Sequence, residues 1–258
     1  MLTKLAARID DATRHGKAIQ QLTEKNQLTV ADGYEIQRLA VARRLRRGEH
    51  TIGTKLGFTS RAKMQQMGLD QIICGRLTSG MLVEDGGTLS LSGLIHPRAE
   101  PEIALLMKHD LSGPVTLPGA MAAVEAVACA IEIIDSRYQN FKFTLPDVIA
   151  DNTSCCRLVL GGWQRPDSDF GNLGMVLQFN GRPVGIGSSA AIMGHPARAL
   201  VAISQLLGEQ GRKVKAGSVV MLGSPMAAQP LAPGMHVLAE TERLGRAEFT
   251  VRQAADRQ

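Results

Sequence analysis

Three glutamates stand in stretches of this chain that otherwise have the composition of buried β-strands. Glu100 and Glu102 precede the apolar run 103–107, and Glu132 follows the apolar run 127–131. Alternate residues of a strand point to the same face, so Glu100 and Glu102 are expected to project side by side. An ionised carboxylate costs several kcal/mol to bury unless it is paired or bound to a metal. A fold that buries these strands must therefore bring a cation to the carboxylates.

Two arrangements satisfy these carboxylates, and their spacing leaves both open. In the first, Glu100 and Glu102 line the polar face of an edge strand, while Glu132 pairs with Arg137 or another basic side chain. In the second, all three carboxylates bind one hard cation such as Mg2+, which prefers oxygen ligands. The apolar residues around them favour the metal.

Size and composition narrow the classes of function. The chain has 258 residues, long for one domain and short for two large ones, so we predict one catalytic domain with a smaller appendage. Aromatic residues make up only 3%, which argues against platforms for stacking nucleic-acid bases. The densest basic run, 43–47, falls at the end of a predicted helix, where cations favour the helix dipole. We predict no nucleic-acid partner, and the net charge of +5 suits a small dianionic substrate.

The cysteines and apolar runs bear on localisation. The cysteines, at positions 74, 129, 155 and 156, have neither the CxxC pairs of a zinc ribbon nor the regular spacing of a secreted scaffold. The first residues lack the apolar segment of a signal peptide, and no apolar run is long enough to span a membrane. The sequence predicts a cytoplasmic protein with reduced thiols and no membrane partner.

Residues 1–50 are predicted to form a helical cap, and residues 51–258 a metal-dependent catalytic domain. Thr29 suits the N-cap of a helix, Asp32 completes a capping box, and Gly48 suits the helix end.

Strand signals dominate the rest of the chain. Strands are expected at 51–58, within 77–111, around Glu132, at 175–186 and at 218–222, with a last hairpin around 244–245 and helices over 60–68, 117–127 and 196–207. Asn180-Gly181 suits the type I′ turn of a hairpin. The predicted fold class is α+β, with a mixed β-roll or barrel as the catalytic body and a small N-terminal helical region.

Motifs spread over nearly the whole chain resemble one enzyme family. In order they are residues 52–60 (IGTKLGFTS), 96–103 (HPRAEPEI), 132–137 (EIIDSR), 150–154 (ADNTS), 185–191 (GIGSSAA) and 194–196 (GHP). They resemble the hydratase/decarboxylase family of aromatic meta-cleavage pathways, within the fumarylacetoacetate hydrolase superfamily. The resemblance implies a catalytic body of that superfamily's C-terminal type.

Within this family, residues 135–152 look like the 4-oxalocrotonate decarboxylase branch rather than the 2-oxopent-4-enoate hydratases. Hydratases carry the motif DQPDFG near the site, whereas residues 70–75 read DQIICG, so the second acid is missing. Hydration needs a group that activates or delivers water, and this loss counts against a hydratase. The resemblance implies decarboxylation of (3E)-2-oxohex-3-enedioate, a 2-oxo dicarboxylate also called 4-oxalocrotonate, to 2-hydroxypenta-2,4-dienoate. A hydratase, or a non-catalytic partner that stabilises one, is the alternative.

The same resemblance implies the centre of the site. Glu100, Glu102 and Glu132 would hold Mg2+ or Mn2+, with the substrate's C1 carboxylate and 2-oxo oxygen completing the shell. Lys55 would lie beside that oxygen and stabilise negative charge on it.

Three more residues are predicted to bind substrate. Asn152 and Ser154 are assigned by family position, with hydrogen bonding inside their loop as the alternative. Arg137 is expected to bind a carboxylate, or else to brace Asp135 or a metal-ligand glutamate. The resemblance also implies a homo-oligomer and a complex with the hydratase that consumes the product.

Overall fold

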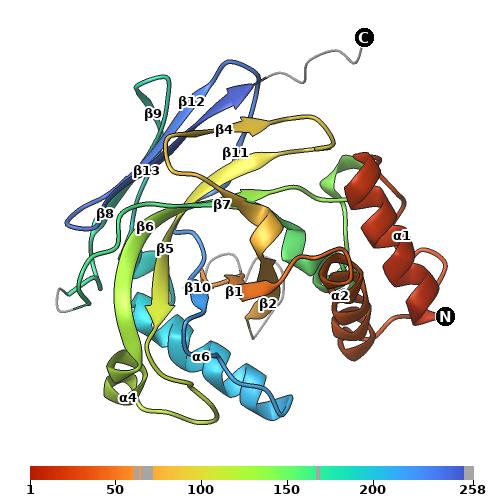
Figure 1. Ribbon diagram of the computed structural model, residues 1–258, viewed down its shortest axis with the longest axis horizontal. Coiled ribbons are helices and arrows are strands. Elements are labelled where there is room, and N and C mark those ends of the chain that lie inside the picture. The colour runs from red at the N-terminus through yellow and green to blue at the C-terminus, as the bar shows by residue number, and fades with distance from the viewer. Residues whose placement is uncertain (61–63, 65–71, 167–168, 253–258) are drawn as a thin grey trace.

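Two mixed β-sheets form the body of the protein, with helices along the larger sheet (Figure 1). The computed structural model describes residues 1–60, 64, 72–166 and 169–252. The predicted α+β class is confirmed, and the larger sheet curls into a half-barrel. Most of the helix predicted over 60–68 lies outside the described residues.

The N-terminal region is helical, as predicted. Helix α1 spans Leu2–His15 and α2 spans Val30–Leu45, which ends three residues before Gly48. The capping box is present, because Asp32 N donates to Thr29 Oγ1 at 3.2 Å and Thr29 N donates to Asp32 Oδ2 at 2.9 Å. Both helices share an apolar cluster with Tyr138 and Ala150 of the following region. The boundary at residue 50 stays a prediction.

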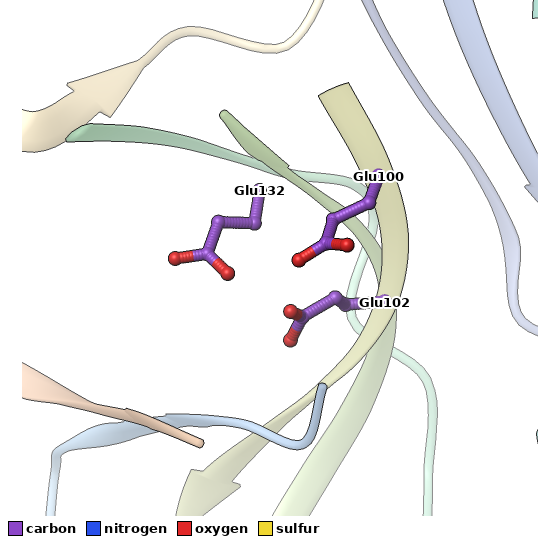
Figure 2. Close-up of side chains that lie close together, drawn as sticks. All are labelled: Glu100, Glu102 and Glu132. Carbon is purple, nitrogen blue, oxygen red and sulfur yellow. The ribbon is translucent and has the colours of Figure 1, made fainter. Parts of the chain in front are cut away.

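The larger sheet carries the glutamates. Its strands lie in the order β2 (Ile73–Thr78), β1 (Thr51–Gly57), β10 (Val219–Met221), β5 (Arg98–Met107), β6 (Val124–Ile134), β7 (Cys155–Leu160) and β3 (Leu82–Val83), with β11 (Gln229–Pro230) paired to β5. The alternation predicted for β5 is observed, since Ala99, Ile103 and Leu105 are fully buried in the main core. Glu100 and Glu102 therefore project from the opposite, concave face (Figure 2).

The smaller sheet covers the convex side of β5 and β6. It consists of β4 (Gly87–Ser90), β13 (Gly245–Arg252), β12 (His236–Thr241), β8 (Gly174–Phe179) and β9 (Arg182–Ser188). The predicted hairpin joins β8 to β9, and Asn180 and Gly181 have φ of 52° and 75°, as a type I′ turn requires. Aliphatic side chains and Phe249 fill the space between the two sheets.

The remaining helices connect the strands. Helix α4 (Leu117–Ala122) is shorter than the predicted 117–127, because from Val124 onward the chain pairs with β5 as part of β6. Helix α5 spans Leu145–Ala150, and α6 spans Pro196–Glu209 with the His195 ring as its N-cap acceptor. Short 3₁₀ turns are η1 (Ser79–Met81), η2 (Gln139–Phe141), η3 (Asn152–Ser154) and η4 (Ser189–Ala191). Across the described ranges, no helix has the length and apolar character to cross a membrane.

Candidate active site

The three glutamates come together because of the register between β5 and β6. Glu100 lies directly opposite Glu132, and Glu102 follows two residues along the same face of β5. Each offers a carboxylate oxygen, and these oxygens all lie within 4.8 Å of one another (Figure 2). Glu102 is 0% and Glu132 1% exposed. The geometry of this cluster therefore fits one shared cation.

The hydrogen bonding of the cluster also fits a metal. Glu102 Oε2 accepts a hydrogen bond of 2.8 Å from the backbone amide of Gly223. Glu102 Oε1 and Glu132 Oε1 are buried without a hydrogen-bond partner. Buried oxygens without partners are costly and uncommon, and oxygen ligands suit Mg2+ or Mn2+. These residues fit a hard divalent cation.

Lys55 reaches the cluster from β1. Its Nζ lies 2.9 Å from Glu132 Oε2 and donates to the carbonyl oxygen of Thr153 at 3.1 Å. Lys55 is 3% exposed. The alternative in which Glu132 pairs with a basic side chain is thus observed with Lys55 and not with Arg137. Lys55 pairs with Glu132, so Glu102 still needs a proton or a metal to compensate its charge.

The charges in this cluster shift each other's protonation. Burial raises the pKa of Glu102 well above its ordinary value, and the neighbouring Glu132 and Glu100 raise it further. Burial is the largest single influence on Lys55 and disfavours its ammonium, but the charges around it, led by that of Glu132, together outweigh burial and keep the pKa of Lys55 above its ordinary value. Without a metal, Glu102 therefore keeps its proton to higher pH than an ordinary glutamate, and a bound cation must compete with that proton.

This competition predicts a dependence of stability on pH. In metal-free protein, the free energy of unfolding should fall as pH rises above 4.5, the ordinary pKa of glutamate, toward the raised pKa of Glu102. The reason is that the folded state keeps a proton that the unfolded chain has released. Excess Mg2+ should remove this loss, because the cation replaces the proton.

The measurement is the melting temperature between about pH 5 and pH 8, with a chelator and with excess Mg2+. The gap between the two curves should widen as pH rises. Metal-free Glu102→Gln should lose this part of the pH dependence. A gap that is the same at every pH would contradict the prediction.

The carbonyl that binds Lys55 belongs to a strained segment. Asn152, Thr153 and Ser154 of η3 have φ of 52°, 53° and 58°, a left-handed conformation that costs non-glycine residues about 1–2 kcal/mol each. The Asn152 side chain stabilises the segment, since its Oδ1 accepts from Arg76 N at 2.7 Å and its Nδ2 donates to Arg76 O at 2.9 Å. This pairing fixes η3 against β2 and directs the Thr153 carbonyl toward Lys55.

The other predicted substrate ligands have distinct surroundings. The Asn152 side chain binds the backbone of Arg76 in β2 and not its own loop, whereas Ser154 Oγ is buried without a partner. Arg137 forms an ion pair with Asp151 and also donates to the Cys155 carbonyl at 3.3 Å. The ion-pair partner of Arg137 is thus Asp151, whereas Asp135 acts on Arg137 through its charge, which helps to raise the arginine's pKa. Direct contact of these three residues with substrate stays a prediction.

Sequence reasoning missed three contributors to the site. The Thr153 carbonyl and the Gly223 amide act through backbone atoms, so their side chains give no signal. Gly75 lies opposite Lys55 in the β1–β2 pair, and its missing Cβ leaves room for η3. The available sequence signal was the glycine at position 75, because a glycine inside a strand often marks a place where another backbone approaches closely.

Gly75 provides a test of how η3 positions Lys55. A Cβ at residue 75 would lie 2.5 Å from Thr153 Oγ1 and 2.6 Å from the Asn152 carbonyl oxygen. Gly75→Ala should therefore destabilise the fold by about 1–3 kcal/mol and lower kcat, because η3 must move with its carbonyl. Gly162→Ala is the matched control, since a Cβ there meets nothing within 4 Å. Equal melting temperatures and kcat for the two variants would contradict the role of Gly75.

Comparison with known proteins identifies the family. Residues 70–252 match the family described as fumarylacetoacetate (FAA) hydrolase, C-terminal. The chain belongs to this family. The predicted resemblance is confirmed along nearly the whole chain, which is 52% identical over 249 residues to a "4-oxalocrotonate decarboxylase" of Pseudomonas sp., covering 96% of this chain and 97% of the relative.

Two further comparisons place this FAA hydrolase family member among hydratases and decarboxylases. It is 39% identical to a "2-hydroxyhexa-2,4-dienoate hydratase" of Comamonas testosteroni, with 88% of each chain covered. Its structure is similar to that of 4-oxalocrotonate decarboxylase from Pseudomonas putida G7 complexed with magnesium and adipate. That match has a TM-score of 0.94 and 37% identity, and covers 97% of both chains.

Proposed function

We propose that this protein is a metal-dependent carboxy-lyase that converts (3E)-2-oxohex-3-enedioate to 2-hydroxypenta-2,4-dienoate and CO2. The observation that carries the proposal is the buried cluster of three glutamates beside Lys55. The cluster lies in a chain that is 52% identical, nearly end to end, to a 4-oxalocrotonate decarboxylase. The cofactor that we assign is Mg2+, with Mn2+ as a substitute, held by Glu100, Glu102 and Glu132.

The substrate is a vinylogous β-keto acid, which determines what the protein must stabilise. When the C5–C6 bond breaks, its electron pair moves through C4 and C3 to the C2 oxygen, and C6 leaves as CO2. The resulting dienolate takes a proton on the C2 oxygen to give the 2-hydroxydienoate. A divalent cation at the three glutamates supplies Lewis-acid stabilisation of negative charge at the 2-oxo acid end.

Lys55 supplies positive charge and a proton donor at the same end. Glu132 and the Thr153 carbonyl orient its ammonium group, whose pKa lies above its ordinary value. An ammonium near the C2 oxygen stabilises the dienolate more than the ketone, which lowers the barrier to loss of CO2. We propose Lys55 as the catalytic residue in this role.

Ile73 separates this chain from the hydratase pattern. It stands where the hydratase motif has its second acid, is 2% exposed, and lies opposite Gly57 on the strand face that carries Lys55. An acid at this position would repel the substrate's C6 carboxylate, which weakens binding, and would assist water addition, whereas isoleucine does neither. The apolar surface of Ile73 therefore favours decarboxylation.

Three polar residues complete the proposed substrate site. Ser154 has a buried hydroxyl without a partner, so we assign it a hydrogen bond to the substrate. Asn152 supports the site by binding the backbone of Arg76, which holds η3 in place. Arg137 supports it through its ion pair with Asp151, the residue that precedes η3.

The second candidate is 2-oxopent-4-enoate hydratase, which the 39% identity to a hydratase favours. One product assay distinguishes the two. Purified protein should release one CO2 per 2-oxohex-3-enedioate consumed, only with Mg2+ or Mn2+ present. Conversion of 2-hydroxypenta-2,4-dienoate to 4-hydroxy-2-oxopentanoate without CO2 release would establish the hydratase. Metal-independent turnover would refute the metal centre, and no turnover of either compound would favour a non-catalytic partner.

Assembly and localisation are also part of the proposal. We assign a cytoplasmic homo-oligomer that binds the hydratase consuming its product, because a reactive dienol is best transferred directly. All four cysteines are free and buried, in keeping with a reducing compartment. Light scattering of the purified protein alone should give a mass above that of a monomer. A mixture with the hydratase should give a mass above that of either protein measured by itself.

A further inference from the structure

A cavity lies where α2 and α5 meet the edge strand β2 near the end of α6. Its volume is about 440 Å³. Its described lining includes none of the three glutamates, Lys55 or the residues of η3. Ligand pockets commonly have volumes of about 300–1,000 Å³, so this cavity has room for a small organic molecule.

Most of the wall is apolar. The apolar wall is formed mainly by Val30, Tyr34, Ile72, Leu145, Ile149 and Leu206. Ile73, which we assign to the substrate site, also lines this cavity, so the two sites are neighbours. The Tyr34 hydroxyl accepts a hydrogen bond of 3.3 Å from Cys74 N, and Gln37 Nε2 donates to the carbonyls of Cys74 and Ile149 at 2.9 and 3.0 Å. These contacts fix α2 against β2 and α5, so the elements that form the wall are held together.

Arginines supply the polar part of the lining. Arg76 Nε is buried without a hydrogen-bond partner, and no described acid forms an ion pair with Arg76. Arg212 also lines the cavity, is close enough to repel the charge of Arg76, and donates to Gln210 Oε1 at 3.0 Å. The acid in the described lining is Glu35, and both of its oxygens accept from Arg38 at 2.7 Å. Arg76 and Arg212 therefore leave this cavity with uncompensated positive charge.

We propose that this cavity binds a small monocarboxylate with an apolar body, whose carboxylate lies between Arg76 and Arg212. A guanidinium presents its N–H groups in the planar fork that a carboxylate matches. An anion there would satisfy Arg76 Nε and relieve the repulsion between the arginines. The apolar wall would bury the hydrocarbon part of the ligand.

The variants that test this site leave the catalytic segment in place. Asn152 holds Arg76 through backbone atoms alone, so Arg76→Gln keeps both of those hydrogen bonds. Arg212→Gln removes the second charge from a different part of the chain. Ala31→Phe fills the cavity while leaving both arginines. Arg14→Gln, at an exposed residue of α1, is the matched control.

The experiment is calorimetric titration of the Mg2+-loaded protein with hexanoate. Wild type should bind one equivalent, and each of Arg76→Gln, Arg212→Gln and Ala31→Phe should weaken binding roughly tenfold or more, whereas Arg14→Gln should not. Glu102→Gln should bind hexanoate like wild type, because the glutamate cluster does not line the cavity. Hexanol, which lacks the charge, should bind at least roughly tenfold more weakly than hexanoate.

Three results would overturn the proposal. The first is no binding of hexanoate by wild type up to about 10 mM. The second is binding that is lost in Glu102→Gln and kept in the arginine variants, which would place the carboxylate at the metal centre. The third is inorganic phosphate binding as tightly as hexanoate, which would show that the apolar wall contributes nothing. Because none of these depends on turnover, the site stands or falls separately from the proposed decarboxylase activity.

Discussion

Replacing Glu102 by glutamine is expected to weaken Mg2+ binding severely and to lower kcat/KM by roughly 10³-fold or more. Glu102 is fully buried, with Oε2 held by the Gly223 amide and Oε1 without a partner. Glutamine keeps the size of the side chain but removes one anionic ligand and places an amide among carboxylates. The loss of a ligand should remove most of the charge stabilisation at the 2-oxo acid end.

The same substitution should stabilise the metal-free protein. Burial and the charges of Glu132 and Glu100 disfavour ionised Glu102. Above pH 4.5 the metal-free protein must therefore take up a proton on folding, whereas glutamine is neutral in both states and avoids that cost. We therefore expect metal-free Glu102→Gln to melt at a higher temperature than metal-free wild type, with little further gain from Mg2+. Calorimetric Mg2+ titration, CO2 release and melting curves measure the three effects.

Glu125→Gln is the matched control for this substitution. Glu125 lies on β6, as Glu132 does, but its side chain is 52% exposed and pairs with Lys108 at 3.6 Å. That exposed pair contributes little, so Mg2+ affinity and turnover should stay at the wild-type level. Wild-type Mg2+ affinity and turnover in Glu102→Gln would remove Glu102 from the metal centre.

Replacing Lys55 by methionine should lower kcat by about 10²–10³-fold while leaving the metal centre able to bind Mg2+. Methionine keeps most of the length of the side chain and removes the charge that lies 2.9 Å from Glu132 Oε2. The three carboxylates then repel one another without compensation from lysine. Mg2+ affinity should be equal to or greater than that of wild type, because the cation no longer competes with the ammonium.

The stability of Lys55→Met should depend on whether Mg2+ is bound. In metal-free protein, removal of one member of a buried ion pair should cost about 3–5 kcal/mol, since Glu132 remains buried without Lys55. Mg2+ should restore much of this loss. Lys108→Met is the control, because that lysine is 54% exposed and its loss should change neither property. If Lys55→Met lost Mg2+ affinity and turnover together, Lys55 would be part of the metal centre and not a separate catalytic group.

Local signals predicted much of the fold because each depends on nearby residues. Thr29 and Asp32 form a capping box across three residues, and Asn180-Gly181 adopts the positive φ angles of its turn through local sterics. The helix predicted to run to residue 127 instead ends at Ala122. There the pairing of β6 with β5 decided the outcome, and that pairing involves residues distant in sequence.

The sequence by itself determined the chemistry of the centre. Glutamates at 100 and 102 must share a face of a strand, and carboxylates buried in apolar surroundings require a cation. Tertiary structure alone decided which groups meet there. The β5–β6 register brings Glu132 opposite Glu100. The packing of η3 against the β1–β2 pair brings the Thr153 carbonyl within hydrogen-bond distance of Lys55. The tertiary structure also decided that Arg137 forms its ion pair with Asp151. These contacts join residues far apart in the chain, many through backbone atoms that are the same in every residue, so only the folded backbone could select them.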